Sequence, residues 1–191
     1  PMYGLLRLSD GEVWCFMGDI DNIDGKNVKK AKQKEVIVSS FATTYIFEAG
    51  SVELTVKFVS PLPPDDLTLL SCPVCYMDYE VAPKKKLGKV SVGLFVHEET
   101  CYDRHPMPVR GGVIELPQGE CAWFGLKKQL VMSQAYDSSA AEWGYWYLTG
   151  DKAFMMSSEG LTSYIATGKT EFICDDESDK YISAFGEYEN V

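Results

Sequence analysis

A period-two alternation of apolar and polar residues runs through most of this 191-residue chain and limits its fold more than any other feature. The alternation is clearest in FATTYIFEAGSVELTVKF, residues 41–58, where large apolar side chains occupy alternate positions on both sides of Ala49-Gly50. Successive side chains of a strand point to opposite faces of a sheet. The segment therefore predicts two antiparallel strands with one buried face, joined by a turn at Gly50.

The same pattern recurs along the chain, and helical periodicity is nearly absent. A hairpin is predicted over 3–18, because Asp10-Gly11 supplies the positive backbone angles of a tight turn. Further strands are predicted at 74–81, 90–96, 112–116, 121–132, 161–167 and 181–185. Short helical turns are expected at 65–70 and 138–142, and the polar segment 19–34 is expected to be an exposed loop.

These short strands, separated by Gly, Pro and Asp, are typical of an all-β protein. We predict an antiparallel β-sandwich of two sheets, similar to a supersandwich, that forms a single domain over residues 1–191. A chain of this length buries roughly 70% of its unfolded surface, so one core is sufficient for stability.

Composition and charge exclude several classes of partner. The formal net charge is −10, and phosphate contacts need clustered Lys and Arg, so we expect neither a nucleic-acid nor a membrane-surface partner. No stretch approaches the roughly 20 apolar residues of a membrane helix.

The six cysteines are irregularly spaced, which favours free thiols and a cytoplasmic location. Because the chain begins with Pro1, we expect a piece of a longer protein, and a secreted or periplasmic parent stays open.

A proline-rich segment, SPLPPDDLTLLSCPVC at 60–75, follows the predicted hairpin. Pro61 and Pro64 cannot donate to a sheet, so they are expected to end the strand. Asp65 or Asp66 is expected to cap one helical turn, and its leucines to close the end of the core. The segment is therefore interpreted as a corner between two sheets.

Two cysteines at the end of that corner, Cys72 and Cys75, have the spacing of thiol redox and zinc pairs. A strand that includes Cys75 would point the two sulfurs to opposite faces, and no second Cys or His pair has zinc-like spacing. Ordinary free thiols are therefore the favoured interpretation.

The densest set of acid–base groups lies at Glu98, Glu99, Asp103 and His105. These residue types bind metals or serve as general acids and bases, so one hypothesis is a self-contained hydrolase. The alternative is an ordinary solvated loop. The chain has no HExxH, nucleophile elbow or phosphate-binding glycine loop, so we predict no catalytic set, no metal and no cofactor.

An aromatic run, EWGYWYLTG at 142–150, offers a different chemistry. Exposed aromatic rings stack on sugars, and a carboxylate such as Glu142 can hold sugar hydroxyls. Trp143, Tyr145 and Trp146 are the candidate stacking residues. Because aromatic residues also fill sandwich cores, burial of one alternating set is the competing interpretation.

Three segments together resemble a known family: GLLRLSDGEVWCFMG, TTYIFEAGSVELTVKFVSPLPPDDLTLLSCPVCYMDYEV and EWGYWYLTG. In this order they are similar to the N-terminal β-sandwich region of glutaminase A-like proteins of bacteria and fungi. In that family the sandwich precedes a larger helical domain, an α/α toroid. The segment HEETCYDRHPMP departs from the family pattern, and Glu142 stands where the family commonly has Asp.

The resemblance implies a non-catalytic domain of a larger hydrolase, inactive alone, that packs against the toroid of the same parent chain. The family name implies hydrolysis of the glutamine side-chain amide, and a toroid also fits a glycan substrate, bound where the two domains meet. A carbohydrate-binding module is the alternative. Docking predicts an exposed apolar patch, expected to consist of Met, Trp and Tyr residues.

Overall fold

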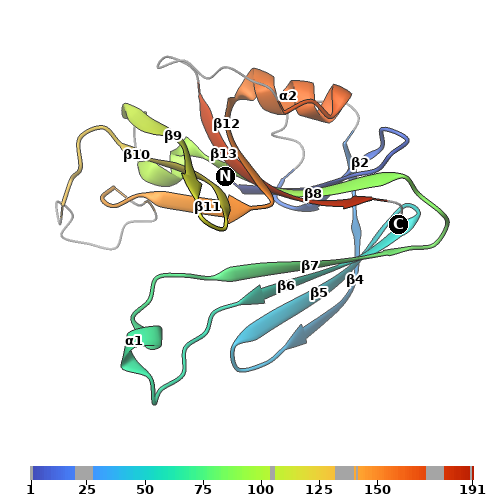
Figure 1. Ribbon diagram of the computed structural model, residues 1–191, viewed down its shortest axis with the longest axis horizontal. Helices are drawn as coiled ribbons and strands as arrows, with labels where there is room; N and C mark the ends of the chain where they lie inside the picture. The colour runs from blue at the N-terminus through green and yellow to red at the C-terminus, as the bar shows by residue number, and fades with distance from the viewer. Residues whose placement is uncertain are drawn as a thin grey trace.

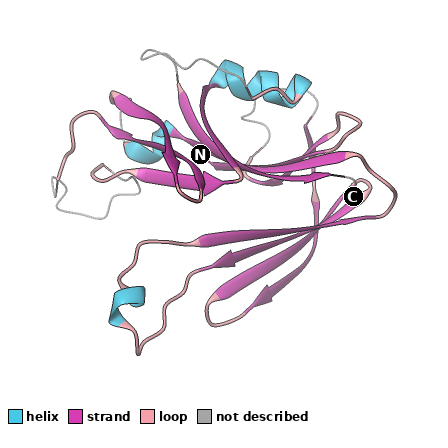
Figure 2. Ribbon diagram, in the orientation of Figure 1, coloured by secondary structure: helices cyan, strands magenta, loops and turns pink. Residues whose placement is uncertain are grey.

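The all-β fold class is confirmed by the computed structural model, in which strands make up most of the chain (Figures 1 and 2). The structure describes residues 2–19, 28–103, 106–131, 140, 142–170, 179–189 and 191, and these contain thirteen strands in three sheets. No helix among these residues is long and apolar enough to cross a membrane.

The largest sheet, sheet A, has six strands. In order across the sheet they are β12 (Lys152–Ser157), β13 (Lys180–Glu189), β8 (Lys89–His97), β1 (Met2–Arg7), β2 (Val13–Met17) and β3 (Val28–Lys30). All neighbours are antiparallel except β2 and β3, which are parallel. The predicted N-terminal hairpin is therefore present as β1 and β2.

Two smaller sheets complete the fold. Sheet B has the order β4 (Lys32–Val38), β5 (Ala42–Ala49), β6 (Val52–Val59) and β7 (Tyr76–Pro83). Sheet C has the order β11 (Trp146–Gly150), β10 (Gly119–Leu126) and β9 (Val109–Leu116). Both are antiparallel throughout. The predicted hairpin at 41–58 is β5 and β6, and Gly50 in its turn has a φ of +59°.

Sheets B and C share one face of sheet A. The residues of β8 that point to this face show the division: Val90 and Val92 pack with sheet B, whereas Val96 packs with sheet C. The opposite face of sheet A carries α2 (Ser158–Thr167), whose Tyr164 ring lies 5.4 Å from that of Phe95. The second layer of the sandwich is thus divided between two sheets, and three clusters of buried residues form the core.

The expectation of an exposed loop at 19–34 is wrong for residues 28–34. Residues 20–27 lie outside the described residues, but Val28–Lys30 is β3 and Lys32 begins β4. Ala31, between them, is buried and donates its N–H to the Cys15 carbonyl at 2.8 Å. Pairing with β2 and β5 orders this polar segment. Because these partners lie elsewhere in the sequence, the hydropathy of the segment itself did not predict its strands.

The strand predicted at 161–167 is also wrong, because this segment is helical. Ser157 caps α2 by accepting from the Gly160 N–H at 3.2 Å, and Gly168 ends it in the left-handed region at φ +75°. Leu161, Tyr164 and Ile165 are buried at helical spacing. The β-branched residues favoured a strand, but the cap, the terminal glycine and packing on sheet A favour a helix.

The corner at 60–75 contains the predicted helical turn, α1 (Leu67–Leu70), but that turn does not close the core. No residue of α1 is buried, and Leu67 is 74% exposed. In Figure 1, α1 lies at the end of sheet B that is farthest from sheet A. The corner joins β6 to β7 within one sheet instead of joining two sheets.

Several remaining boundaries differ from the sequence prediction. The strand expected from Val74 begins at Tyr76, so Cys75 precedes it. Strands β11 and β12 were not predicted, since their aromatic and methionine residues have no clear alternation. The helical turn expected at 138–142 lies almost entirely outside the described residues.

Candidate binding surfaces

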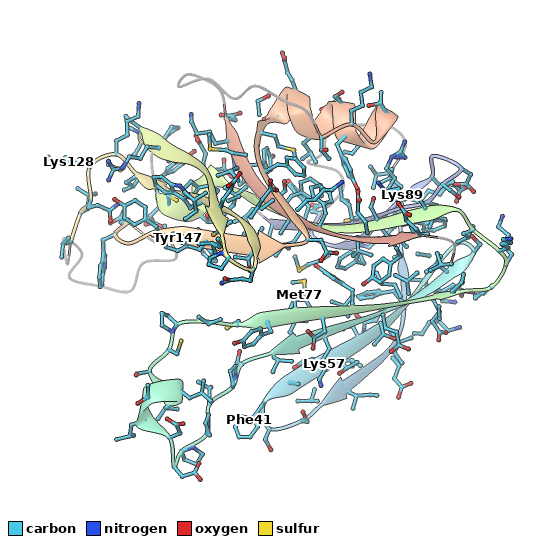
Figure 3. All side chains as sticks on the ribbon, in the orientation of Figure 1. Phe41, Lys57, Met77, Lys89, Lys128 and Tyr147 are labelled. Atoms are coloured by element: carbon cyan, nitrogen blue, oxygen red, sulfur yellow. The ribbon has the colours of Figure 1, made fainter. Side chains whose placement is uncertain are left out.

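One face of sheet B is apolar and only partly covered. Cross-strand pairing places Val36 beside Tyr45, Val38 beside Thr43 and Phe58 beside Met77, all on the side that faces sheet A. We call these six residues the open inner face. Sheet B diverges from the rest of the molecule toward its free end, and Met77 points into the intervening space (Figure 3). Val38 is consequently 75% exposed.

A pocket of about 370 Å³ lies where the open inner face meets sheet A. Its lining residues are Phe16, Met17, Gln33, Thr43, Tyr45, Phe47 and Phe58. The Tyr45 ring stacks on Phe47 at 6.0 Å and meets Phe58 edge-on at 5.8 Å between centroids. None of the lining side chains is charged, so the pocket suits an apolar or aromatic group with at most a few hydrogen bonds.

The opposite face of sheet B is polar. Lys57 pairs with Asp78 and Thr44 there, and Thr55 pairs with Glu80. Ion pairs join Glu48 to Lys34 and Lys84, and these partners hold the pKa of the Glu48 carboxyl below its usual range. The contrast identifies the inner face as the one suited to an apolar partner.

The residues of the proline-rich corner have structural contacts. The Asp66 carboxylate accepts the Leu69 N–H at 3.0 Å, which is the N-cap bond of α1. Asp65 is exposed beside it, and Pro61 and Pro64 follow the end of β6. Gly50 lies at the other end of sheet B, where an added Cβ would come within 2.8 Å of the Trp14 ring.

Both cysteines of the CxxC sequence are exposed and free. The Cys75 sulfur forms a hydrogen bond with the Ser60 hydroxyl at 3.3 Å. Two free thiols at this spacing do not by themselves define a redox or metal site.

One of the acidic candidates, Glu98, forms part of the framework between β8 and β13. Glu98 is buried, accepts the backbone N–H of Lys180 at 3.2 Å and lies 3.5 Å from the Tyr102 hydroxyl. Burial raises the pKa of its carboxyl, and the ammonium of Lys180 opposes part of that rise. Because its oxygens hold the start of β13, we interpret Glu98 as a structural carboxylate.

The neighbouring candidates are arranged differently. Glu99 and Asp103 are exposed, while the imidazole of the preceding His97 is buried and accepts the Glu99 N–H at 3.4 Å. Burial lowers the pKa of His97. His105 lies outside the described residues. Within the described part of the chain, no three His, Cys, Asp or Glu side chains are grouped to hold a metal ion.

The aromatic run is divided between the core and the surface. Trp146 packs into the cluster between sheets A and C, and Glu142 is buried. Trp143 is exposed, Tyr145 is half-buried and Tyr147 is 60% exposed. Of the four candidates, Trp143 and Tyr145 therefore keep the exposure that stacking requires, and Tyr147 adds a third ring.

Two further residues belong with these rings, and the sequence did not single them out. Trp123 on β10 is the direct cross-strand partner of Tyr147 on β11, and the Arg110 guanidinium donates to the Tyr145 hydroxyl at 2.5 Å. The alternation of CAWFG could have placed Trp123 on the surface, because Ala122 and Phe124 are its buried neighbours. The link to Arg110 depends on pairing across 35 residues.

The fold and these surfaces together define an all-β sandwich domain with exposed apolar and aromatic faces. More particularly, the chain belongs to a family described as a domain of unknown function (DUF5127), whose model matches residues 42–177. That range includes all of sheet C and most of sheet B, but not β1, β2, β3 or β13 of sheet A. No curated protein and no solved structure matches the chain.

Proposed function

We propose that this chain is the non-catalytic N-terminal β-sandwich domain of a larger glutaminase A-like hydrolase. Its role is to pack against a helical α/α toroid domain of the same parent chain. The order of three segments that resemble that family supports the proposal, and two of them lie largely or wholly within the residues that match the family model. The parent enzyme would hydrolyse the glutamine side-chain amide, or a glycan, where the two domains meet.

The observation that carries this proposal is the open inner face of sheet B. Six uncharged side chains line it, Val38 is mostly exposed, and an aromatic pocket lies at its base. Apolar surface of this kind is stabilised by association, since its burial contributes about 25 cal/mol per Å². The expected composition of Met, Trp and Tyr is matched only by Tyr45 and Met77, and no tryptophan belongs to the open inner face.

A matched pair of substitutions on β4 tests the docking role. Val38→Glu places a charge on the open inner face, whereas Ile37→Glu places one on the opposite face of the same strand, 50% exposed before substitution. With the downstream helical segment of the parent gene co-expressed, Val38→Glu should abolish co-purification. Ile37→Glu should preserve it, because the outer face is already charged and solvated.

Equal co-purification of both variants would exclude the open inner face as the docking surface. A parent gene without a helical segment downstream would exclude the accessory-domain role itself. Activity should require the helical segment: turnover of glutamine by this chain alone would contradict a non-catalytic role.

Carbohydrate binding is the second candidate function. Exposure of Trp143 and Tyr147 favours it, since aromatic side chains in solvent supply flat apolar surface for sugar rings. A carbohydrate-binding module would bind glycans without any helical partner, which distinguishes this function from the first.

A further inference from the structure

The solvent-facing side of sheet C carries a group of aromatic rings that the core does not use. Trp123 and Tyr147 are opposite each other in the β10–β11 register. The Tyr145 ring is near both, with its centroid 5.5 Å from that of Trp123 and 6.4 Å from that of Tyr147. Neighbouring positions along the strands, such as Phe124 and Trp146, pack into the core. The three rings therefore belong to the outward face of the sheet.

A glycine on β10 allows the Tyr145 ring to approach the sheet closely. Gly112, the β9 partner of Trp123, imposes no such limit, because an added Cβ there would make an ordinary contact of 3.7 Å with the indole nitrogen. At Gly125 an added Cβ would lie 2.5 Å from the Tyr145 ring. A larger residue at Gly125 would displace Tyr145, so this glycine holds the ring against the backbone.

The rings form a corner and not a flat surface. Trp123 and Tyr145 have an interplanar angle of 79°, and Tyr145 and Tyr147 one of 60°. A guest ring that lies on one of these faces therefore meets an adjacent ring along its edge. Such a corner fits a ring that has an apolar C–H face and a polar rim.

Polar donors border this corner. The Arg110 guanidinium lies 5.6 Å from the centre of the Tyr145 ring and donates to its hydroxyl. A guanidinium has five N–H donors in a fixed plane, so an exposed arginine can also donate to ligand hydroxyls. Thr149, exposed two residues beyond Tyr147, lies on the same face of β11.

We infer that this aromatic corner, formed by Trp123, Tyr145, Tyr147 and Arg110, binds the sugar rings of a neutral oligosaccharide. A pyranose offers the C–H face that stacks on an aromatic ring and the hydroxyls that accept from arginine. Nucleotide bases also stack on aromatic residues, but the net charge of −10 repels a polyanion. A neutral chain of sugars avoids that cost.

This inference rests on the second candidate function, carbohydrate binding, and is independent of docking at sheet B. The corner would give that function a site that differs from the one the sequence predicted. Trp146, a predicted stacking residue, packs against the core and is not part of the corner. Trp123 and Arg110, which the sequence did not single out, belong to it instead.

Calorimetric titration of the chain with cellohexaose, xylohexaose and mannohexaose tests the site. At least one of these neutral hexasaccharides should bind. Tyr147→Ala should weaken that binding about tenfold, the loss expected when one stacking ring is removed. Trp123→Ala should do the same and Trp123→Phe should retain most of the affinity, because a ring remains in place.

Tyr76→Ala is the matched control. Tyr76 is 54% exposed, comparable with Tyr147, but lies on the outer face of sheet B. Its removal should leave affinity unchanged, and denaturation curves should show that each variant remains folded.

Three outcomes would overturn the inference. Hexasaccharide binding that persists in Tyr147→Ala and Trp123→Ala would exclude the corner but leave carbohydrate binding as a function of the chain. No binding of any of the three hexasaccharides by the unaltered chain would exclude both. If the corner variants lose only their association with the helical segment, the corner is an interdomain contact instead of a sugar site.

Discussion

The two ends of sheet B have the same strands and the same alternation but different surroundings. At the base, next to sheet A, Val52, Leu54 and Val56 are fully buried. At the free end, Val38 lies on the same face and is 75% exposed. The sequence pattern does not change between the ends, because both are apolar on one face. What differs is that sheet B diverges from the rest of the molecule toward its free end (Figure 1).

Alternation identifies the apolar face of a strand but does not indicate what covers that face. Period two indicates which face of a strand is apolar, since that follows from the backbone. It does not indicate whether another layer covers that face. At the base of sheet B the cover is within the chain, and at the free end we propose that it comes from a partner domain.

The largest expected effect compares the same substitution at the two ends. Leu54→Ala removes a side chain that is 0% exposed, whereas Leu67→Ala removes one in α1 that is 74% exposed. Loss of buried contacts and the remaining cavity should lower the unfolding free energy by about 3 kcal/mol in Leu54→Ala. Leu67→Ala should change it by less than about 0.5 kcal/mol.

Denaturation with guanidinium chloride, followed by tryptophan fluorescence, measures both values. Similar losses in the two variants would mean that the free end is packed as tightly as the base. The contrast between the ends would then be wrong.

A second effect, smaller than that of Leu54→Ala, is expected from pH and arises in sheet A, where His97 ends β8. Burial beside Tyr181, its β13 partner, lowers the pKa of His97, so the folded state favours the neutral imidazole. The folded protein therefore binds fewer protons than the unfolded chain below about pH 6.5, the ordinary histidine value. Stability should be complete above that pH and fall as the pH drops below it.

Denaturation midpoints between pH 7.5 and pH 5.5, roughly spanning the histidine range, measure this dependence. His97→Gln should reduce it. Glu98 acts in the opposite direction, because its raised pKa makes folding favour the protonated carboxyl. The difference between the two proteins isolates His97, since Glu98 is present in both. Identical pH profiles would show that His97 is protonated equally easily in the folded and unfolded states.

The smallest expected effect is at the cap of α1. Asp66→Ala removes the bond to the Leu69 N–H, and a lost cap typically costs about 1 kcal/mol. Since no residue of α1 is buried, the cost should appear as local unfolding and change global stability by less than about 0.5 kcal/mol.

Amide hydrogen exchange of α1 should accelerate in Asp66→Ala and remain unchanged in Asp65→Ala, its matched control. A global loss of about 1 kcal/mol or more would mean that α1 supports the rest of sheet B.

Local signals predicted most of the fold. Asp10-Gly11 and Ala49-Gly50 identified the two hairpin turns, where Gly11 and Gly50 have positive φ angles. Segments ordered by distant partners were not predicted. Lys29 belongs to a strand because β2 pairs with it, and Tyr164 belongs to a helix whose face packs on Phe95 and Phe185. Non-local pairing of this kind has no signature within a short window of sequence.

The candidate sites were predictable to a smaller extent. Residue type directed attention to the aromatic run, but neither spacing nor composition could separate Trp146 in the core from Tyr147 at the surface. Likewise Glu98 and Glu99 are adjacent in sequence, yet one is buried against Lys180 and the other is exposed. A side chain's chemistry depends on its neighbours, and those come from other strands.

The sequence by itself determined the all-β class, the hairpins of sheets A and B and the apolar faces of the strands that it predicted. These depend on backbone geometry and turn residues, which act over a few positions. Only the tertiary structure decided that sheets B and C divide one face of sheet A, that the free end of sheet B diverges from it, and that Trp123 meets Tyr145 and Tyr147. Burial and contact are properties of surfaces brought together from distant parts of the chain, so they are fixed only when the sheets pack.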